Sequence, residues 1–291
     1  MPVLGLGLCC RLTAMGDAAR ASVLWYLLLG GRHLDDAQIY GNHAQVGEGL
    51  RQAVARGVPR EEVFFVTKIP GHLFGKRAAR SWFEKMLRET GLGYVDLVLL
   101  HAAGPEKWAA QELECGKMPD MKKCREETWL TLDSFRAEGR LRHLGVSNFG
   151  PRQMQELMAL GKAPLAVNQL EYHPWMRDEQ RRAVEFCHRH GIAVTAHSLF
   201  GGANGVGNIY KDPTLAGIAS AHGKSASQVL LRWAFQNNVS AVPGTGNPEH
   251  MKANVDIFDF ELSAQEMQRL DRHPSGHQAA VHPQHVPDAI P

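Results

Sequence analysis

The chain has 291 residues, and its 32 Lys and Arg against 30 Asp and Glu give a formal net charge of only +2. This balance provides neither the basic surface of a nucleic-acid-binding protein nor a polybasic patch for a membrane. Hydrophobic residues at 44% and charged residues at 21% are typical of a folded globular protein, and the length suits one large domain or two medium ones.

The chain lacks the signals of a membrane, secreted or metal-binding protein. Its most apolar window, residues 21–30, is shorter than the ~20 residues of a membrane span, and no basic region precedes an apolar stretch at the N-terminus. The five cysteines are an odd number without a C-x-x-C pair, so we expect no disulfide framework, no zinc site and a reducing, cytoplasmic location. Fifteen histidines are scattered without metal-ligand spacing, so no metal is expected.

Short hydrophobic runs alternate with longer amphipathic segments along the whole chain. The runs predict strands at 3–8, 33–38, 63–69, 95–101, 143–149, 165–172, 193–199 and 240–243. The amphipathic segments predict helices at 17–29, 44–56, 76–89, 125–137, 152–160, 179–190 and 226–236. Many of these helices are followed by a glycine, which is the usual residue for a left-handed helix end.

Eight strands alternating with helices predict an α/β protein with a (β/α)8 TIM barrel, formed by residues 1–291 as a single domain. The rival fold, a doubly wound sheet that binds a dinucleotide, requires G-x-G-x-x-G after its first strand. Here Gly5-Leu6-Gly7 is followed by Leu8-Cys9-Cys10, so that fingerprint fails. Residues 102–123 form a long polar connection that we interpret as a functional loop, and residues 273–291 predict an irregular C-terminal arm.

Polar residues at the predicted strand ends are the candidates for chemistry, because barrel active sites lie there. A lysine that closes an apolar strand, Lys68, needs a carboxylate partner, and Asp35 on the neighbouring strand is placed to provide it. A purely structural ion pair is one interpretation. With Tyr40 and His101 nearby, a second is catalysis: the Lys68 ammonium would lower the pKa of Tyr40 from about 10, and His101 would orient a carbonyl substrate.

Several segments in this order resemble the aldo-keto reductases. They are residues 31–42, which read GRHLDDAQIYGN, then 66–68, 94–97 and His101, followed by 144–149, 167–174, 228–233 and 258–263. The resemblance implies a nicotinamide-dependent enzyme that reduces aldehydes or ketones to alcohols. Tyr40 would be the general acid, Lys68 and Asp35 would depress its pKa, and His101 would orient the carbonyl. Hydride would come from the reduced nicotinamide, so the cofactor carries the hydride chemistry.

The resemblance also implies a set of cofactor-binding residues. Ser147, Asn148 and Gln169 match the residues that hold the nicotinamide carboxamide, although Ser147 and Asn148 are alternatively interpreted as caps of the following helix. Where the family commonly has a tyrosine that stacks on the nicotinamide, this chain has His197, followed by Ser198 and Phe200. A histidine ring would stack with less area than a tyrosine ring.

The segment after the last predicted strand departs from the family pattern. Gly244 replaces a lysine and His250 replaces an arginine, two cations that grip the adenosine 2′-phosphate, whereas Thr245, Gly246 and Asn254 retain hydrogen-bonding capacity. The family as a whole favours NADP, so NADP is expected, with NAD as the alternative.

The expected partners are small carbonyl compounds. We expect the protein to bind neither nucleic acid nor membranes and to be a monomer. Ala102 and Ala103 stand where the family often has Trp-Pro, which predicts a wider pocket, and Trp108 in the long loop is a candidate wall. The N-terminal hairpin of the family would precede Met1. Two other function classes are alternatives to a reductase. One is a cofactor-binding regulatory or redox-sensing barrel with little turnover. The other is a metal-dependent hydrolase, which would need several metal ligands at the strand ends, where only His101 and His197 are candidates.

Overall fold

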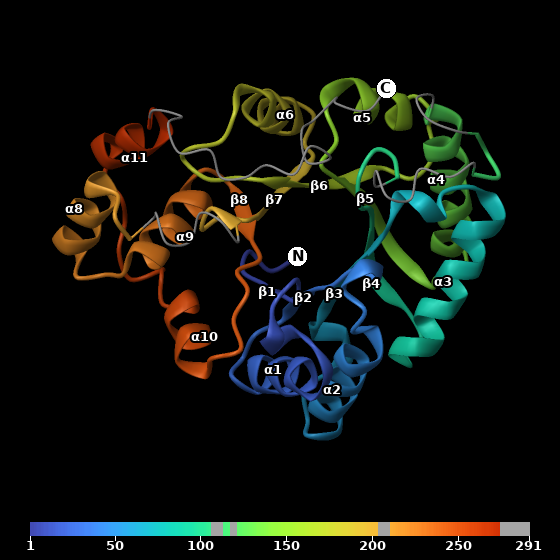
Figure 1. Ribbon diagram of the computed structural model, residues 1–291, viewed down its shortest axis with the longest axis horizontal. Helices are drawn as coiled ribbons and strands as arrows, with labels where there is room; N and C mark the ends of the chain where they lie inside the picture. Colours follow the sequence, from blue (N-terminus) through green and yellow to red (C-terminus); the bar gives the residue numbers. More distant parts are fainter. Residues whose placement is uncertain (106–112, 117–120, 203–209, 274–291) are drawn as a thin grey trace.

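The computed structural model of the protein describes residues 1–105, 113–116, 121–202 and 210–273. Eight parallel strands form one sheet in the order β1 to β8, and Figure 1 shows them around the centre with the helices outside. The strands are β1 (Leu6–Gly7), β2 (His33–Asp35), β3 (Phe64–Ile69), β4 (Val95–Leu100), β5 (Leu141–Ser147), β6 (Leu165–Glu171), β7 (Ala193–His197) and β8 (Val239–Ala241). A parallel bridge between Leu4 and Ala241 joins the two ends of the sheet, so the predicted (β/α)8 barrel is confirmed.

Helices connect the strands on the outside of the barrel (Figure 1). They are α1 (Gly16–Leu28), α2 (His43–Ala55), α3 (Lys76–Thr90), α4 (Lys122–Ala137), α5 (Pro151–Met158), α6 (Asp178–Arg189), α8 (Pro213–His222), α9 (Ala226–Gln236), α10 (Pro248–Val255) and α11 (Ala264–Asp271). Short 3-10 helices lie at η1 (Leu12–Ala14), η2 (Gln38–Tyr40), η3 (Arg60–Glu62) and η4 (Gly71–Leu73). Each helix predicted from the sequence is present within a few residues of its predicted ends.

Helices α8, α10 and α11 were not predicted, although their sequences carry start signals. Asp212, Asn247 and Ser263 are the N-caps, and each side chain accepts a hydrogen bond from a backbone N–H of the first turn. Pro213 and Pro248 follow two of these caps at a position that suits proline. The three helices are short, with eight to ten residues each, and α8 and α10 have weak hydrophobic periodicity, whereas α11 is amphipathic.

The alternation of side chains along the strands separates an outer core from the barrel interior. Val66, Leu97, Leu99 and Val167 form a small hydrophobic cluster of their own, apart from the large cluster between sheet and helices. Because every second residue of a strand shares a face, Lys68 continues the side of Val66, and His101 continues the side of Leu97 and Leu99. Both polar residues therefore lie above the apolar layer, at the carboxyl ends of β3 and β4.

The cysteines correct the prediction that the chain has no disulfide. The structure joins Cys115 to Cys124, with Cα atoms 5.1 Å apart. This separation lies in the usual range for a disulfide of about 4.4–6.8 Å. Cys187 is a buried free thiol. The odd count therefore did not exclude a pair, because Cys115 and Cys124 are brought together by the connection that leads into α4.

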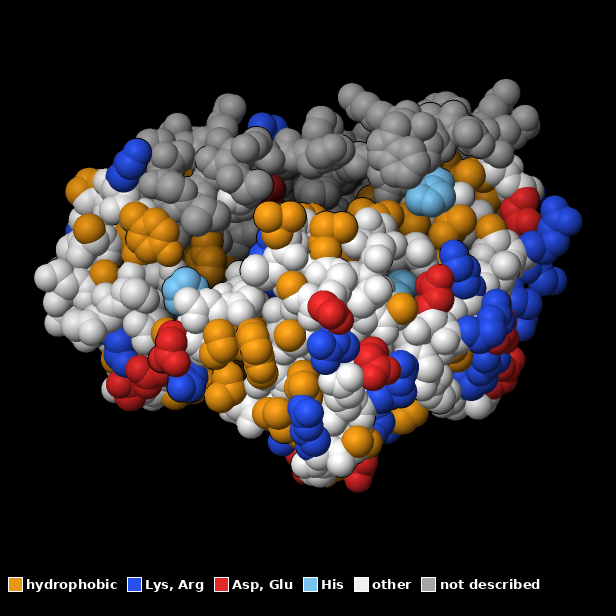
Figure 2. Space-filling model, turned by 60° about the horizontal axis from the view of Figure 1, so that its bottom comes forward, with side chains coloured by type: hydrophobic (Ala, Val, Ile, Leu, Met, Phe, Trp, Pro, Cys, Tyr) orange, Lys and Arg blue, Asp and Glu red, His pale blue; other side chains and the backbone are white. Residues whose placement is uncertain are grey.

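The two irregular segments are described in part. In the long connection, residues 106–112 and 117–120, and with them Trp108, lie outside the described residues, and α4 begins at Lys122, before the predicted end of the loop. In the C-terminal arm only His273 is described, and its Nε2 lies 2.7 Å from Asp212 Oδ2. Within the described ranges, no helix has the length and apolar character required to cross a membrane. Figure 2 shows basic and acidic side chains interleaved with hydrophobic ones on the face that it presents.

Asp96 in β4 is expected to stabilise the fold and to have no role in the candidate functional site. Its buried carboxylate accepts hydrogen bonds from Arg60 (3.0 Å), Arg142 (2.8 Å) and the backbone N–H of Phe65 (3.0 Å), close to the start of β3 and β4. We expect Asp96→Asn to lower the free energy of unfolding by about 2–3 kcal/mol, because bonds to a charged group are lost. Urea unfolding measures this. Asp17→Asn, at an exposed side chain, is the control, and equal stability of the two variants would contradict the prediction.

Candidate functional site

The structure brings Asp35, Tyr40, Lys68 and His101 together at the carboxyl ends of β2, β3 and β4. The Lys68 ammonium donates to Asp35 Oδ2 at 2.7 Å and to the Tyr40 hydroxyl at 3.2 Å. The rings of Tyr40 and His101 meet edge to face with centroids 5.8 Å apart. Lys68 and Asp35 are buried, whereas Tyr40 and His101 are partly exposed. The two partly exposed side chains are thus the ones that a ligand reaches.

The local backbone places Tyr40 over Lys68. After β2 ends at Asp35, η2 turns the chain back, and Gly41 ends this turn in a left-handed conformation with φ of 67°. The strand predicted for 33–38 is therefore shorter than expected. Lys68 also donates to the backbone oxygen of Asp36 at 3.0 Å, which fixes the ammonium under the turn. Glycine suits position 41 because other residues rarely adopt this φ.

Burial and neighbouring charges shift the pKa values of Lys68 and Tyr40 in opposite directions. Burial disfavours the Lys68 ammonium, but Asp35 and Tyr40 together outweigh it and raise the pKa of Lys68. Burial raises the pKa of Tyr40 and outweighs the Lys68 charge, which lowers it. Lys68 therefore lowers the pKa of Tyr40 as predicted, but Asp35 raises it, contrary to the prediction, and with burial the net pKa lies above the usual value in the protein without ligands. The phenol stays protonated at neutral pH, and the ammonium beside it stays charged.

A hydrogen-bonded group of polar side chains continues the site along β5 and β6. Gln169 Nε2 donates to Asp35 Oδ1 at 2.7 Å, which links β6 directly to the Lys68 pair across the barrel. Ser147 Oγ donates to the backbone oxygen of Gln169 at 3.0 Å, and Asn148 Nδ2 donates to the backbone oxygen of His101 at 3.1 Å. Gln169 therefore contacts the Lys68 pair directly, while Ser147 is bonded to Gln169 and Asn148 to His101.

The alternative interpretation of Ser147 and Asn148 as helix caps is wrong. The N-cap of α5 is Gly150, whose backbone N–H donates to Gln153 Oε1 at 3.0 Å. Asn148 instead adopts a left-handed conformation, with φ of 62°. This conformation is uncommon outside glycine, and such residues concentrate at functional sites.

His197 at the end of β7 belongs to the same network. Its Nε2 lies 2.9 Å from Asn148 Oδ1, and its Nδ1 lies 3.0 Å from the hydroxyl of Ser198, a residue with φ of 54°. Both bonds lie in the plane of the ring, so they do not compete with a stacking contact on a ring face. Phe200 is partly buried and packs against the main hydrophobic core.

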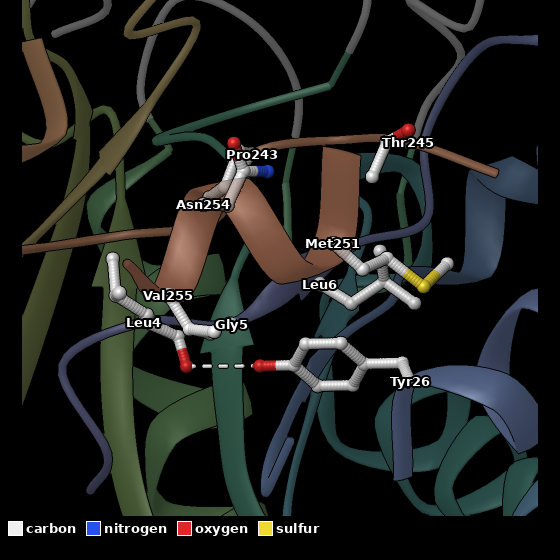
Figure 3. Close-up of a pocket in the computed structure, with 9 residues that line it drawn as sticks. All are labelled: Leu4, Gly5, Leu6, Tyr26, Pro243, Thr245, Met251, Asn254 and Val255. Atoms are coloured by element: carbon white, nitrogen blue, oxygen red, sulfur yellow. Dashed lines mark hydrogen bonds between the residues drawn. The ribbon is translucent and has the colours of Figure 1, made fainter. Parts of the chain in front are cut away.

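The remaining predicted residues lie on the segment after β8 and on α10. Gly244 is exposed, Thr245 and Gly246 are partly exposed, and His250 is exposed on α10. Figure 3 shows Thr245 and Asn254 at a pocket whose other walls are the start of the chain and Tyr26. This pocket has a cavity volume of only about 10 Å³, roughly the space that one water molecule needs, and its lining is mostly apolar. The pocket itself is therefore too small for a dinucleotide.

Two polar residues near the site were not singled out in the sequence. Arg11 follows β1, and its guanidinium lies against Gly244. Asp36 lies next to Asp35 but is fully buried, and the His43 imidazole lies close to it, with Nε2 3.7 Å from Asp36 Oδ2. Burial lowers the pKa of His43 to about 4, so this neighbour is neutral at neutral pH. The sequence contains a signal for Arg11, because it is a cation placed just after a strand. It contains none for Asp36, since burial depends on how η2 and α2 pack.

Asp36 is expected to make stability fall as pH rises. Burial raises its pKa to about 8, and the described residues offer its oxygens no well-formed hydrogen bond. The unfolded chain releases this proton near pH 4, so the stabilisation present below pH 4 is lost progressively up to about pH 8. The thermal midpoint of Asp36→Asn should therefore rise relative to that of the natural protein as pH increases from 5 to 8. A difference that is constant over this range would contradict the assignment.

Comparison with models of protein families matches residues 14–274 to one described as "Aldo/keto reductase family". The chain belongs to the aldo/keto reductases. It is 36% identical to a 9,11-endoperoxide prostaglandin H2 reductase of Trypanosoma cruzi (strain CL Brener), over 93% of this chain and 87% of that protein. It is also 36% identical to a morphine 6-dehydrogenase of Pseudomonas putida, over 98% of this chain and 92% of that protein.

A solved structure of similar shape agrees with the family. The Bombyx mori aldo-keto reductase in complex with NADP has a TM-score of 0.86 and 28% sequence identity, covering 100% of this chain and 95% of that one. The resemblance of the sequence motifs to the aldo-keto reductases is thereby confirmed. This family is one of oxidoreductases, and the polar side chains described above lie at the carboxyl ends of the strands. Within the described residues, no group of three or more His, Cys, Asp and Glu could hold a metal ion.

Proposed function

We propose that this protein reduces aldehydes or ketones to alcohols with a reduced nicotinamide cofactor, NADPH in preference to NADH, and that Tyr40 is the general acid. The observation that carries the proposal is the hydrogen bond of 3.2 Å between the buried Lys68 ammonium and the partly exposed Tyr40 hydroxyl. A structural ion pair needs Asp35 and Lys68 only. The tyrosine above them, which faces a histidine at the next strand end, is what an acid for a carbonyl oxygen requires.

The polar side chains around Tyr40 fit a nicotinamide. Its carboxamide has one oxygen that accepts and two N–H groups that donate, and Ser147, Asn148 and Gln169 combine a hydroxyl with two amides at the ends of β5 and β6. His197 and Ser198 at the end of β7 border the same place, and Phe200 lies just beyond. We propose that these six residues hold the nicotinamide end, and that Gly244, Thr245, Gly246, His250 and Asn254 border the adenosine end.

The protein's own residues would perform the proton transfer. The bound cofactor supplies a hydride to the carbonyl carbon, while the Tyr40 hydroxyl gives its proton to the carbonyl oxygen. Since burial keeps the pKa of Tyr40 above its usual value, the acid is fully protonated before the reaction. Once the proton has left, the phenolate is next to the Lys68 ammonium, which is held in place by Asp35. His101 would hydrogen-bond the carbonyl oxygen and orient it towards Tyr40.

Further properties are proposed with the function. The substrate is a small carbonyl compound, and the enzyme works as a single-domain monomer in the cytoplasm. The balanced charge of +2 supports a protein without nucleic-acid or membrane partners. The Cys115 to Cys124 bond argues against a reducing compartment, so thiol counting on protein extracted under acid quench tests the location. Two reactive thiols at these positions would agree with the cytoplasm, and a persistent bond would contradict it.

The experiment that tests the function follows the absorbance of NADPH with a panel of reactive aldehydes and ketones. We expect NADPH to be consumed in equal amount to the alcohol formed, with the alcohol quantified by chromatography. Binding of NADPH without turnover of any carbonyl compound would overturn the enzyme assignment and favour the regulatory barrel. Absence of both binding and turnover would overturn the assignment of the cofactor as well.

A further inference from the structure

The buried carboxyl group of Asp36 lies behind the Lys68 pair. The backbone N–H of Asp36 donates to the backbone oxygen of Val66 at 2.9 Å, and the backbone oxygen of Asp36 accepts from the Lys68 ammonium at 3.0 Å. Successive side chains of an extended segment point to opposite faces, so Asp36 points towards the helices while Asp35 points into the barrel. Two neighbouring carboxyl groups therefore flank the backbone that holds the Lys68 ammonium.

The surroundings of Asp36 disfavour its ionised form. The side chain is fully buried, and neither of its oxygens has a well-formed hydrogen bond within the described ranges. His43 Nε2, at 3.7 Å from Asp36 Oδ2, is beyond hydrogen-bond distance. Burial raises the pKa of Asp36 to about 8 and outweighs the backbone N–H of Ala37 and the Lys68 charge, which lower it. Asp36 is therefore a neutral carboxylic acid at neutral pH.

A path of polar side chains leads from Asp36 to solvent. The buried His43 ring lies between two elements, with Nε2 2.8 Å from the Thr67 hydroxyl and Nδ1 3.7 Å from Glu89 Oε2. The Glu89 side chain is 33% exposed, and its other oxygen lies 3.5 Å from the Lys85 ammonium. Protons can therefore pass between Asp36 and bulk water along the outside of the sheet, without entering the barrel.

Charged and titratable groups face Asp36 from each element around it. They are Asp35 in β2, Tyr40 in η2, Lys68 in β3, His43 in α2, and Glu89 with Lys85 in α3. Glu89 and Lys85 offset each other near the surface, and His43 is neutral. Burial is the main cause of the raised pKa of Tyr40, and negative charges on Asp35 and Asp36 raise it further. A charge on Asp36 therefore acts on the Tyr40 and Lys68 group.

We propose that Asp36 is a positioning residue that tunes Tyr40 as a proton donor: the neutral acid adds no negative charge behind Lys68, and loss of its proton slows reduction. This role rests on the proposed function. When Tyr40 gives its proton to the carbonyl oxygen, the phenolate is stabilised by the Lys68 ammonium. A second carboxylate beside that ammonium cancels part of this stabilisation. Asp36 points away from the barrel interior, so it acts through Tyr40 and Lys68.

A single-turnover experiment between about pH 6 and about pH 9.5 tests the proposal. Protein saturated with NADPH is mixed with an excess of a reactive aldehyde, and the loss of NADPH absorbance gives the rate. We expect the natural protein to slow in one step of about three- to tenfold, centred near pH 8, to a lower plateau. Asp36→Asn should show no step in this range. Asp17→Asn, the same change at an exposed side chain on α1, should keep the step.

Two further measurements identify the titrating group. His43→Gln should keep the step, because the proton is on the carboxyl group. Loss of the step in His43→Gln with retention in Asp36→Asn would assign it to the imidazole and overturn the proposal. In protein labelled with ¹³C at its aspartate carboxyl carbons, the resonance that Asp36→Asn lacks should titrate near pH 8. Titration of that resonance near pH 4, the ordinary value for aspartate, would also overturn it.

Failure of the role of Asp36 can be told from failure of the proposed function. A step of equal size in the natural protein and in Asp36→Asn overturns the role of Asp36 alone, as does a natural protein whose rate has no step near pH 8. If the natural protein oxidises no NADPH with any aldehyde at any pH, the proposed function fails and the role of Asp36 fails with it.

Discussion

Tyr40→Phe should lower kcat/KM for aldehyde reduction by a factor of about 10²–10⁴ and leave the dissociation constant of NADPH unchanged. The substitution removes one oxygen atom, the proposed proton donor, and general acid catalysis contributes about this much. The ring that faces His101 stays in place. The measurement combines steady-state kinetics with fluorescence titration of the cofactor. An equal loss of cofactor affinity would instead assign Tyr40 to binding.

Tyr94→Phe provides a matched control for this prediction. The same atom is removed from a partly exposed tyrosine just before β4, at the opposite end of the barrel, where the ring lies between the guanidinium groups of Arg60 and Arg142 at 4.1 and 4.3 Å. We expect its kcat/KM to equal that of the natural protein. If Tyr40→Phe and Tyr94→Phe have the same activity, Tyr40 is not the acid.

Lys68→Met should lower both stability and activity. Without the ammonium, the buried Asp35 carboxylate keeps its hydrogen bond from the Gln169 amide but has no ion-pair partner. Loss of one member of a buried ion pair typically costs about 3–5 kcal/mol of stability. For a protein of this size we expect the thermal midpoint to fall by about 5–10 °C. Turnover should also fall, because nothing then stabilises the Tyr40 phenolate.

Two comparisons separate these effects. Adding Asp35→Asn to Lys68→Met removes the uncompensated charge, so the thermal midpoint should recover in part while turnover remains low. Lys85→Met, at a side chain with 58% exposure, should change neither quantity. Full activity of Lys68→Met at a temperature where it is folded would contradict a catalytic role and leave Lys68 with the structural role alone.

The main parts of the fold were predictable because they depend on local patterns. Near-continuous apolar runs such as 95–101 identify strands buried on both faces, and the helices between them have long amphipathic repeats. The shortest elements were harder. The strand predicted at 3–8 is longer than β1, which has two residues, and α10 was not predicted, because few residues define the hydrophobic spacing of such short elements.

The candidate site was predictable in its residues but not in its energetics. Asp35, Lys68 and His101 were found because polar side chains at the end of apolar strands are unusual, and Tyr40 because it follows one of them. The lowering of the Tyr40 pKa by Lys68 was predicted, but the net rise was not, because a lysine is visible in the sequence and the extent of burial is not. The bond between Cys115 and Cys124 was missed because a count of cysteines carries no distances.

By itself, the sequence determined that the chain alternates strands and helices into a barrel and that its strand ends carry a lysine, a tyrosine, a carboxylate and a histidine. Only the tertiary structure decided which charges meet. Positions 11 and 244 are 233 residues apart in a chain that gives no hint of their contact, yet closure of the barrel brings the Arg11 guanidinium against Gly244. A closed barrel makes its first and last strands neighbours, so a cation from the start of the chain lies beside the exposed Gly244.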